Sequence, residues 1–199
     1  MSLGKRVTDF TCSGLGLLLL SPLLLAIALA VWLGDRGPVL YRQERVGRGS
    51  RPFTMLKFRS MVTGADRKGR LVTVGGDERV TPVGRWLRRL KLDELPQLLN
   101  VLRGEMSLVG PRPEVQRYVD LYTAEQRLVL ELVPGITDPA SIKYRDEETV
   151  LAGYDDPDRA YVEVIMPDKI AINLSYAARA TVLSDLAVIL KTLLRITRA

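Results

Sequence analysis

The pattern of apolar and polar positions divides the chain into an uncharged N-terminal segment and a longer mixed region. Residues 11–34 form a run of twenty-four residues without a charge, rich in Leu and Ala, which Lys5 and Arg6 precede. This length reaches the range needed to cross a bilayer. Pro22, near the middle of the run, removes one helical hydrogen bond and clashes with the carbonyl four positions earlier. We therefore predict a helix that kinks at Ser21 and Pro22, with the Ser21 hydroxyl bonding the freed carbonyl.

Three arrangements compete for this segment: a cleaved signal peptide, a spanning helix, and a re-entrant helix that returns to the face it left. The apolar run continues through Trp32 and Leu33, which disfavours a signal peptide. Each half of the kinked helix, about ten residues at 1.5 Å each, reaches only about half of a hydrocarbon core. Cations flank both ends of the run, and both flanks therefore favour the cytoplasmic side. We predict that residues 1–36 form a re-entrant membrane anchor and that residues 37–199 form a compact cytoplasmic domain.

Beyond the anchor, the periodicities predict an α/β domain that is mostly helical with one short β-hairpin. Residues 39–42 and 53–58 read as strands, and Gly47 and Gly49 between them indicate a turn. Residues 67–77 contain three glycines and are predicted to be a mobile loop.

Four segments have the periodicity of helices, and they are residues 81–91, 94–102, 124–132 and 182–196. The first and last are amphipathic, with leucines on one side and cations on the other, so both are candidates to lie in a membrane interface. For residues 81–91, a helix that packs its apolar side against the core is an equally good interpretation. We predict that Asp93 caps the N-terminus of the helix at 94–102.

Composition narrows the classes of chemistry. A chain of 199 residues has room for one compact domain with an appended element. A single cysteine, Cys12, excludes an intramolecular disulfide. The absence of histidine removes the commonest general base and most zinc sites, so chemistry must use carboxylates, Lys, Arg, Tyr or a hard cation.

Charge is arranged in blocks that suit an anionic partner. Residues 36–92 contain fifteen Lys or Arg against four Asp or Glu, whereas residues 146–168 contain eight acids and one Arg. The basic block could meet nucleic acid, a phosphorylated molecule or an anionic membrane surface. Nucleic acid is the weakest of these because Phe53 and Phe58 are among the few aromatic residues available for stacking in that block. The acidic block is predicted to be a solvated loop.

The acid pair Asp93 and Glu94 is the main candidate for chemistry. Taken alone, Asp93 reads as a helix cap and Glu94 as a partner of the helix dipole. However, four nearby cations exceed what one cap needs, and they are Arg85, Arg88, Arg89 and Lys91. In such a field the carboxylates are expected to stay ionised with a lowered pKa, available as a nucleophile or as ligands of Mg²⁺.

The consistent reaction is attack on a phosphate, with arginines stabilising the charge that develops. Two prolines hold Arg112 in "GPRP", residues 110–113, at a low entropic cost, although a simple turn is the alternative. Lys57 and Arg59 alternate on a predicted strand, which directs both toward one ligand.

Three stretches of this chain resemble the bacterial sugar transferase family, the small monotopic polyprenyl-phosphate phosphoglycosyl transferases. They are "YRQERVGRGSRPFTMLKFRSM", "VTPVGRWLRRLKLDELPQLLNVLRGEMSLVGPRPE" and "VPGITDPASI". The resemblance implies transfer of a sugar 1-phosphate from a UDP-sugar to polyprenyl (undecaprenyl) phosphate with release of UMP, which initiates glycan assembly at the bacterial inner membrane on its cytoplasmic face. It also implies that residues 37–199 are the catalytic domain.

The same resemblance implies roles for individual residues. Asp93 would be the nucleophile that forms a covalent phosphosugar intermediate, and Glu94 would help it to hold Mg²⁺ and to orient the substrate. The cations that match phosphate-binding positions are Lys57, Arg59, Arg88 and Arg112, with Arg145 as a further match.

The chain departs from the family pattern after Thr137. Many members continue with a Gly-Trp-Ala-Gln-Val-Asn-Gly type of segment, whereas this chain has Asp-Pro-Ala-Ser at residues 138–141. Sugar specificity therefore does not carry over. The expected partners are a UDP-sugar, polyprenyl phosphate and membrane lipids, with a homodimer and other glycan-assembly enzymes compatible with this reading. A non-catalytic scaffold whose basic surface binds anionic lipids is the alternative function.

Overall fold

The computed structural model describes residues 2–65 and 77–197, which are mostly helical, as predicted. The helices of this part are α1 (Leu3–Asp35), α2 (Pro82–Arg89), α3 (Gln97–Arg103), α4 (Gln116–Val119), α5 (Pro139–Lys143), α6 (Glu147–Ala152), α7 (Pro157–Ala160), α8 (Met166–Ala177) and α9 (Val182–Thr197). The strands are β1 (Leu40–Val46), β2 (Pro52–Phe58), β3 (Ser107–Val109) and β4 (Gly135–Thr137). The shorter turns are η1 (Arg48–Ser50), η3 (Leu92–Glu94), η4 (Gln126–Glu131) and the π-turn η5 (Tyr161–Ile165). The loop predicted at residues 67–77 falls, except for its last residue, outside the described residues.

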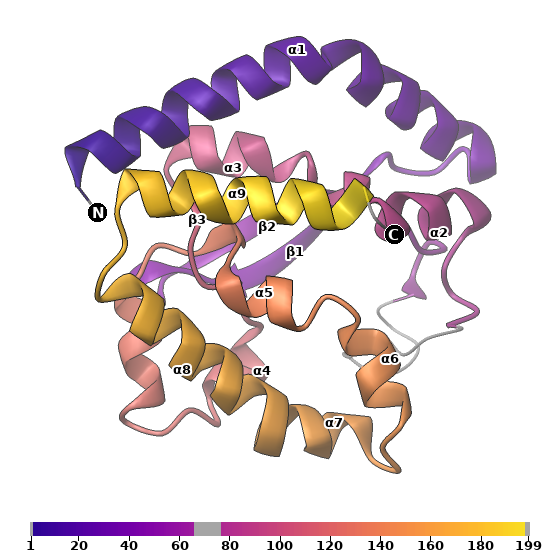
Figure 1. Cartoon of the computed structure of the whole chain (residues 1–199). Coiled ribbons are helices and arrows are strands. Elements are labelled where there is room, and N and C mark those ends of the chain that lie inside the picture. Colours follow the sequence, from indigo (N-terminus) through magenta and orange to yellow (C-terminus); the bar gives the residue numbers. More distant parts are fainter. Residues whose placement is uncertain (1, 66–76, 198–199) are drawn as a thin grey trace.

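The N-terminal helix α1 bends near its middle and arches over the rest of the chain (Figure 1). Pro22 lies inside the helix and cannot donate to the carbonyl of Leu18. The Ser21 hydroxyl donates to that carbonyl instead, over 2.8 Å. This confirms the predicted compensation at Ser21 and Pro22.

The first half of α1 is attached to the domain by charged side chains. Lys5 donates to the carbonyl of Val109 over 2.9 Å and pairs with Asp185 of α9 at 2.6 Å. Arg6 donates to two carbonyls at the end of α3. Asp9 is buried and accepts from a backbone N–H of β3. These cations therefore hold the helix start against the domain.

The second half of α1 returns to the same body. Ile27 and Val31 are buried against Phe58 of β2 and Leu87 of α2. Just beyond them, Asp35 at the helix end pairs with an arginine that follows β2. Both ends of α1 are thus fixed to one domain, and only its bent middle stands away from it.

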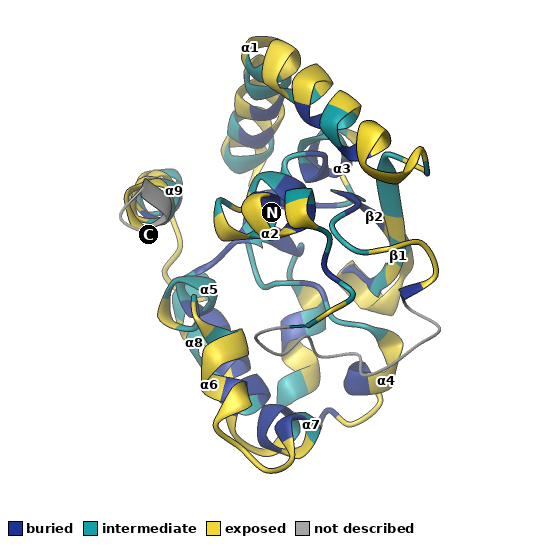
Figure 2. Cartoon of the chain, turned by 90° about the vertical axis from the view of Figure 1, so that its right-hand side faces the viewer, coloured by how far each residue is buried: buried dark blue, intermediate teal, exposed yellow. Residues whose placement is uncertain are grey.

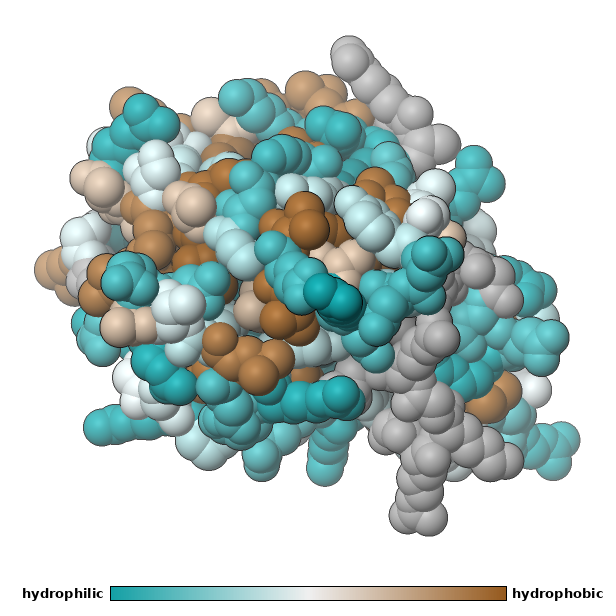
Figure 3. Space-filling model, turned by 90° about the horizontal axis from the view of Figure 1, so that it is seen from below, coloured by the Kyte–Doolittle hydropathy of each residue, from teal (hydrophilic) through white to brown (hydrophobic). Residues whose placement is uncertain are grey.

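The outer side of α1 is apolar and exposed (Figure 2). Leu18, Leu19 and Leu25 are 70%, 76% and 72% exposed. Within the described part of the chain, α1 is also the helix that is long and apolar enough to cross a membrane. The face of the molecule opposite α1 is largely hydrophilic, with scattered hydrophobic patches (Figure 3). The molecule therefore has one strongly apolar side.

Two small sheets organise the rest. β1 and β2 form the predicted antiparallel hairpin, although β1 extends four residues past its predicted end at Arg42, to Val46. The turn between them uses Gly49 at φ +65°, a conformation that glycine adopts at low cost. β3 and β4 pair in parallel, and this sheet was not predicted. Each of its strands has three residues, too few to show an alternating pattern.

The remaining helix predictions were of mixed accuracy. α2 and α9 closely match the predicted segments 81–91 and 182–196. The α-helix predicted at 124–132 is wrong in type, because the chain forms the tighter 3₁₀ turn η4 there. On α2, Leu87 is fully buried while Trp86 is half exposed, so the helix uses one part of its apolar side for the core.

Candidate active site

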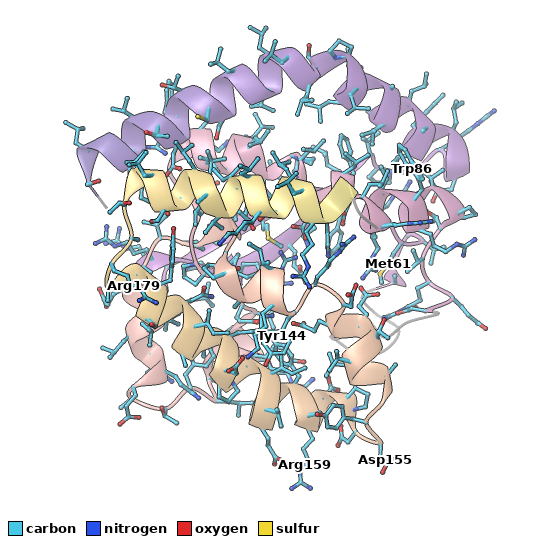
Figure 4. The ribbon with its side chains drawn as sticks, in the orientation of Figure 1. Met61, Trp86, Tyr144, Asp155, Arg159 and Arg179 are labelled. Carbon is cyan, nitrogen blue, oxygen red and sulfur yellow. The ribbon has the colours of Figure 1, made fainter. Side chains whose placement is uncertain are left out.

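A large open cavity of about 1290 Å³ lies between the hairpin, α2, η3, the α5–α6 region and α9. It brings together residues that are far apart in the sequence. Met61 and Tyr144 both line it, Met61 from the segment after the hairpin and Tyr144 from the end of α5 (Figure 4). All seven residues that the sequence singled out for chemistry line this cavity, and they are Lys57, Arg59, Arg88, Asp93, Glu94, Arg112 and Arg145.

The acid pair lies in the 3₁₀ turn η3 and not at a helix cap as predicted. α3 begins only at Gln97, and no side chain caps it. Proline is a physical reason, because Pro96 would be the third residue of the predicted helix and has no N–H for the Asp93 side chain to accept from. The carbonyl of Leu92 accepts from Leu95 N–H over 3.3 Å, which tightens the turn. Neither Asp93 nor Glu94 therefore caps α3, and both are buried at the cavity wall.

Glu94 is held by two cations from different elements. Lys57 at the end of β2 donates to Oε1 over 3.1 Å. Arg112 donates to both carboxylate oxygens, one of them over 3.2 Å. Burial would raise the pKa of Glu94, but Arg112 and Lys57 together lower it well below its usual value. Glu94 is therefore a fixed, ionised carboxylate.

Asp93 has a different environment. Its Oδ1 atom is buried and has no hydrogen-bond partner among the described residues. Burial and the neighbouring Glu94 raise the pKa of Asp93, although Lys57, Lys91 and Arg88 oppose the increase. The prediction of a lowered pKa for Asp93 is therefore wrong. Lys57 and Arg112 form their hydrogen bonds with Glu94 and mainly offset the charge of that residue. Both oxygens of Glu94 thus accept hydrogen bonds, whereas Asp93 Oδ1 has no partner among the described residues.

Side chains from other elements hold the segment that carries Arg112. It follows β3 in the Pro-Arg-Pro segment, and Arg45 of β1 donates to the carbonyl of Pro113 over 3.0 Å. Glu114 in turn accepts from the hydroxyl of Tyr161 and lies 3.6 Å from Arg45. These contacts hold the segment in place, and the part that its two prolines play in positioning Arg112 stays a prediction.

The three other predicted phosphate-binding arginines have protein partners. Arg59 pairs with Asp35 and donates to Thr63 over 2.7 Å. Arg88 of α2 pairs with Glu148 of α6. Arg145 donates to a carbonyl in the last turn of α9. Their positions at the cavity fit the prediction, and their role toward a phosphate stays a prediction.

The donor set fits Mg²⁺ only in part. Among residues 2–65 and 77–197, no group of three or more His, Cys, Asp or Glu is close enough to hold a metal ion. Mg²⁺ is commonly held by one or two carboxylates together with substrate phosphates and water, and the unpartnered Asp93 Oδ1 suits that role. Both oxygens of Glu94 already accept hydrogen bonds from cations, so Glu94 fits a metal less well.

The acidic block at residues 146–168 is not the solvated loop that we predicted. It forms α6, α7 and η5, and its Leu151 and Tyr161 are buried in the largest core cluster. Glu147 and Glu148 of this block line the cavity, as does Lys169. Sequence reasoning missed all three of these residues.

A sequence signal was present for the starts of α5 and α7. An aspartate followed by proline is typical of a helix start, because the aspartate caps and proline suits the first turn. Asp138 precedes Pro139 and accepts from Ser141 N–H at the start of α5. Asp156 precedes Pro157 and accepts from Arg159 N–H in the same way at the start of α7.

An apolar arched helix on one side and a buried acid pair among fixed cations are features of a membrane-associated enzyme that acts on phosphorylated substrates. The model of the bacterial sugar transferase family matches residues 1–199. The chain belongs to this family.

Named relatives agree with this membership. The chain is 40% identical over 197 residues to the UDP-glucose:undecaprenyl-phosphate glucose-1-phosphate transferase of Caulobacter vibrioides, a match that covers 96% of this chain and 69% of the relative. It is 49% identical over 151 residues to the undecaprenyl-phosphate glucose phosphotransferase of Komagataeibacter xylinus, covering 70% of this chain and 28% of the relative. It is 46% identical over 121 residues to the UDP-N-acetylgalactosamine-undecaprenyl-phosphate N-acetylgalactosaminephosphotransferase of Aeromonas hydrophila, a match that covers 61% of this chain and 29% of the relative. The chain thus spans less than a third of the length of two of these relatives.

Proposed function

We propose that this chain transfers a sugar 1-phosphate from a UDP-sugar to undecaprenyl phosphate, forming undecaprenyl-diphosphate-sugar and releasing UMP. Relatives that share 40% or more of the matched residues carry names for this type of reaction. The reaction belongs at the bacterial inner membrane, with the cavity on the cytoplasmic side, where the nucleotide-sugar is dissolved. It would supply the first lipid-linked sugar for glycan assembly.

The observation that carries this proposal is the contrast within the acid pair. Glu94 has its oxygens occupied by Lys57 and Arg112, whereas Asp93 Oδ1 is buried in the cavity wall without a partner. A buried oxygen that makes no hydrogen bond is costly unless a ligand completes it. Asp93 is therefore the acid with an atom available to attack.

The reaction proceeds in two displacements at phosphorus. An oxygen of Asp93 attacks the phosphorus that bears the sugar, the bond from that phosphorus to the UMP oxygen breaks, and UMP leaves. The phosphate oxygen of undecaprenyl phosphate then attacks the same phosphorus and releases the Asp93 carboxylate. Lys57 and Arg112 hold Glu94 beside the reacting group and stabilise the negative charge that develops on the phosphoryl oxygens.

A Mg²⁺ ion, when bound by Asp93 together with substrate phosphates and water, would neutralise phosphate charge and favour the ionised form of the carboxyl. Arg88 faces the same cavity from α2. Its guanidinium is suited to the leaving UMP phosphate once it separates from Glu148.

The geometry of α1 supports a re-entrant anchor. Both ends of α1 are attached to one domain, and its exposed apolar middle would enter the lipid only on one side. The leucine stripe of α9 is also exposed, with Leu183 at 79% and Leu190 at 58%. Together these surfaces would hold the cavity near the headgroups, where the acceptor phosphate lies.

Cysteine labelling tests this topology. In a Cys12→Ser background, we expect Leu3→Cys and Arg36→Cys both to react with an impermeant maleimide from the cytoplasmic side of inverted vesicles and neither from the periplasmic side. The reason is that charged contacts fix both flanks to the same domain. Labelling of the two positions from opposite sides would establish a spanning helix and contradict the proposal.

A UMP-release assay tests the reaction class. With undecaprenyl phosphate and a panel of UDP-sugars, we expect one or more donors to yield UMP, and we expect a chelator to stop the release until Mg²⁺ is restored. Release of UDP would indicate direct glycosyl transfer instead. Binding to anionic vesicles without any nucleotide release, independent of Mg²⁺, would favour the scaffold function.

A further inference from the structure

The cavity has two walls that differ in charge. The α2 side carries cations that line the cavity, namely Arg85, Arg88, Arg89 and Lys91. The side formed by α5, α6 and α8 carries three acids as well as two cations, namely Asp146, Glu147 and Glu148 with Arg145 and the buried Lys169. Asp93, with its unpartnered buried oxygen, lies in the same cavity. A site for phosphates alone would not place carboxylates on one wall, because they repel a second phosphate.

Glu147 is held by a buried lysine. Lys169 of α8 is 8% exposed and donates to Glu147 Oε2 over 2.8 Å. The Lys169 ammonium also lies 5.4 Å from the ring centre of Tyr161, which holds it from the other side. Among the residues that the structure describes, no hydrogen bond reaches Glu147 Oε1. Glu147 therefore presents one oriented acceptor oxygen at the cavity.

Glu147 shares the cavity with the acid pair. Glu147, Asp93, Glu94 and Arg112 all line it. Glu94 raises the pKa of Arg112 most, burial opposes the increase, and Glu147 adds to it. A sugar attached to a phosphate at Asp93 would extend within the same cavity as Glu147.

We propose that Glu147, held by Lys169, binds hydroxyl groups of the donor's sugar and forms the sugar subsite of this chain. The inference rests on the proposed function, in which the sugar and UMP are attached to the same phosphorus through different oxygens, with UMP opposite the attacking Asp93 oxygen. The UMP part contains the other of the donor's two phosphates and belongs on the cationic α2 wall. The sugar is uncharged and rich in hydroxyl donors, which a carboxylate accepts, so it belongs on the wall formed by α6 and α8.

The test compares a donor with a fragment that lacks the sugar. Binding of UDP and of the best-used UDP-sugar is measured by calorimetry with the detergent-solubilised full chain in an Asp93→Asn background, which forms no covalent adduct, and KM is measured by UMP release with Asp93 intact. For Glu147→Gln we expect the KM and the dissociation constant of the UDP-sugar to rise about tenfold or more, because a hydrogen bond to a charged group is weakened. The affinity for UDP should stay within about twofold, since UDP carries no sugar hydroxyls for Glu147 to accept from.

Two further variants keep the test decisive. Glu147→Asp retains the charge opposite Lys169 but withdraws the carboxylate, so it should also weaken the UDP-sugar selectively even if Glu147→Gln fails to fold. Glu163→Gln, an exposed acid of the same segment paired with Arg159, should bind both ligands like the wild type.

The outcomes separate this inference from the proposed function. If the wild type releases UMP but the Glu147 variants weaken UDP and UDP-sugar equally, Glu147 belongs to the nucleotide side or to the fold, and the inference fails. Unchanged binding of both ligands also overturns it. If the wild type releases UMP from no donor in the panel, the proposed function itself fails.

Discussion

Asp93→Asn is expected to lower the rate of UMP release by at least about 10⁴-fold, because an amide cannot form the covalent phosphosugar intermediate. The fold should be retained within about 1 kcal/mol, since asparagine has nearly the same shape and burial already disfavours the charged form of Asp93. The measurement is the initial rate of UMP release with the preferred donor, together with the thermal midpoint of the purified variant.

The covalent step has its own readout. Wild-type protein incubated with UDP-sugar and no lipid acceptor should gain the mass of one sugar phosphate, and Asp93→Asn should not. Asp155→Asn, which removes an exposed acid far from η3 in the sequence, is the control and should behave as the wild type. UMP release by Asp93→Asn at a rate near that of the wild type would remove Asp93 from the mechanism.

Arg112→Met is expected to lower the free energy of unfolding by about 3 kcal/mol, because it leaves the buried Glu94 carboxylate without its bidentate partner. Activity should fall as well, since Arg112 faces the phosphoryl group in the proposed mechanism. Arg112→Lys keeps the charge but loses the bidentate contact, so its stability and activity should lie between those of the wild type and those of Arg112→Met. Denaturant unfolding of the detergent-solubilised protein measures the change.

Two comparisons assign the effect to the ion pair. Arg117→Met, on the exposed side of α4, should change stability by no more than about 0.5 kcal/mol. The double variant Glu94→Gln with Arg112→Met should lose less stability than the sum of the two single variants, because no unpaired charge remains. A single Arg112→Met variant as stable as the wild type would show that Lys57 alone compensates Glu94.

Local sequence patterns were sufficient for the elements with strong periodicity. The second strand of the hairpin, α2 and α9 formed near their predicted limits because their apolar spacing and turn residues act over a few positions. The parallel pair β3 and β4 was missed since its pairing joins Ser107 to Gly135, which no local pattern encodes. The backbone of Gly110 and Gly135 approaches so closely there that a side chain on either would collide with the other strand.

The sequence predicted which residues line the candidate site but not how their charges pair. It placed Asp93 and Glu94 among cations, yet it could not tell which of the two acids would form ion pairs with them. The structure directs Lys57 and Arg112 to Glu94, and this reverses the pKa shift expected for Asp93. Glu147 and Lys169 were missed because their meeting depends on the packing of α6 against the start of α8.

The sequence by itself determined that the chain carries a kinked apolar helix, an acid pair beside fixed cations, and the motifs of the bacterial sugar transferase family. These properties depend on residue chemistry and on spacings of a few positions. Only the tertiary structure decided that both ends of α1 meet one domain, that Glu94 takes the cations while Asp93 keeps an unpartnered oxygen, and that the acidic block forms a wall of the cavity. The reason is that burial and ion pairing are set by contacts between residues far apart in the chain, where desolvation, and not proximity in sequence, selects the partners.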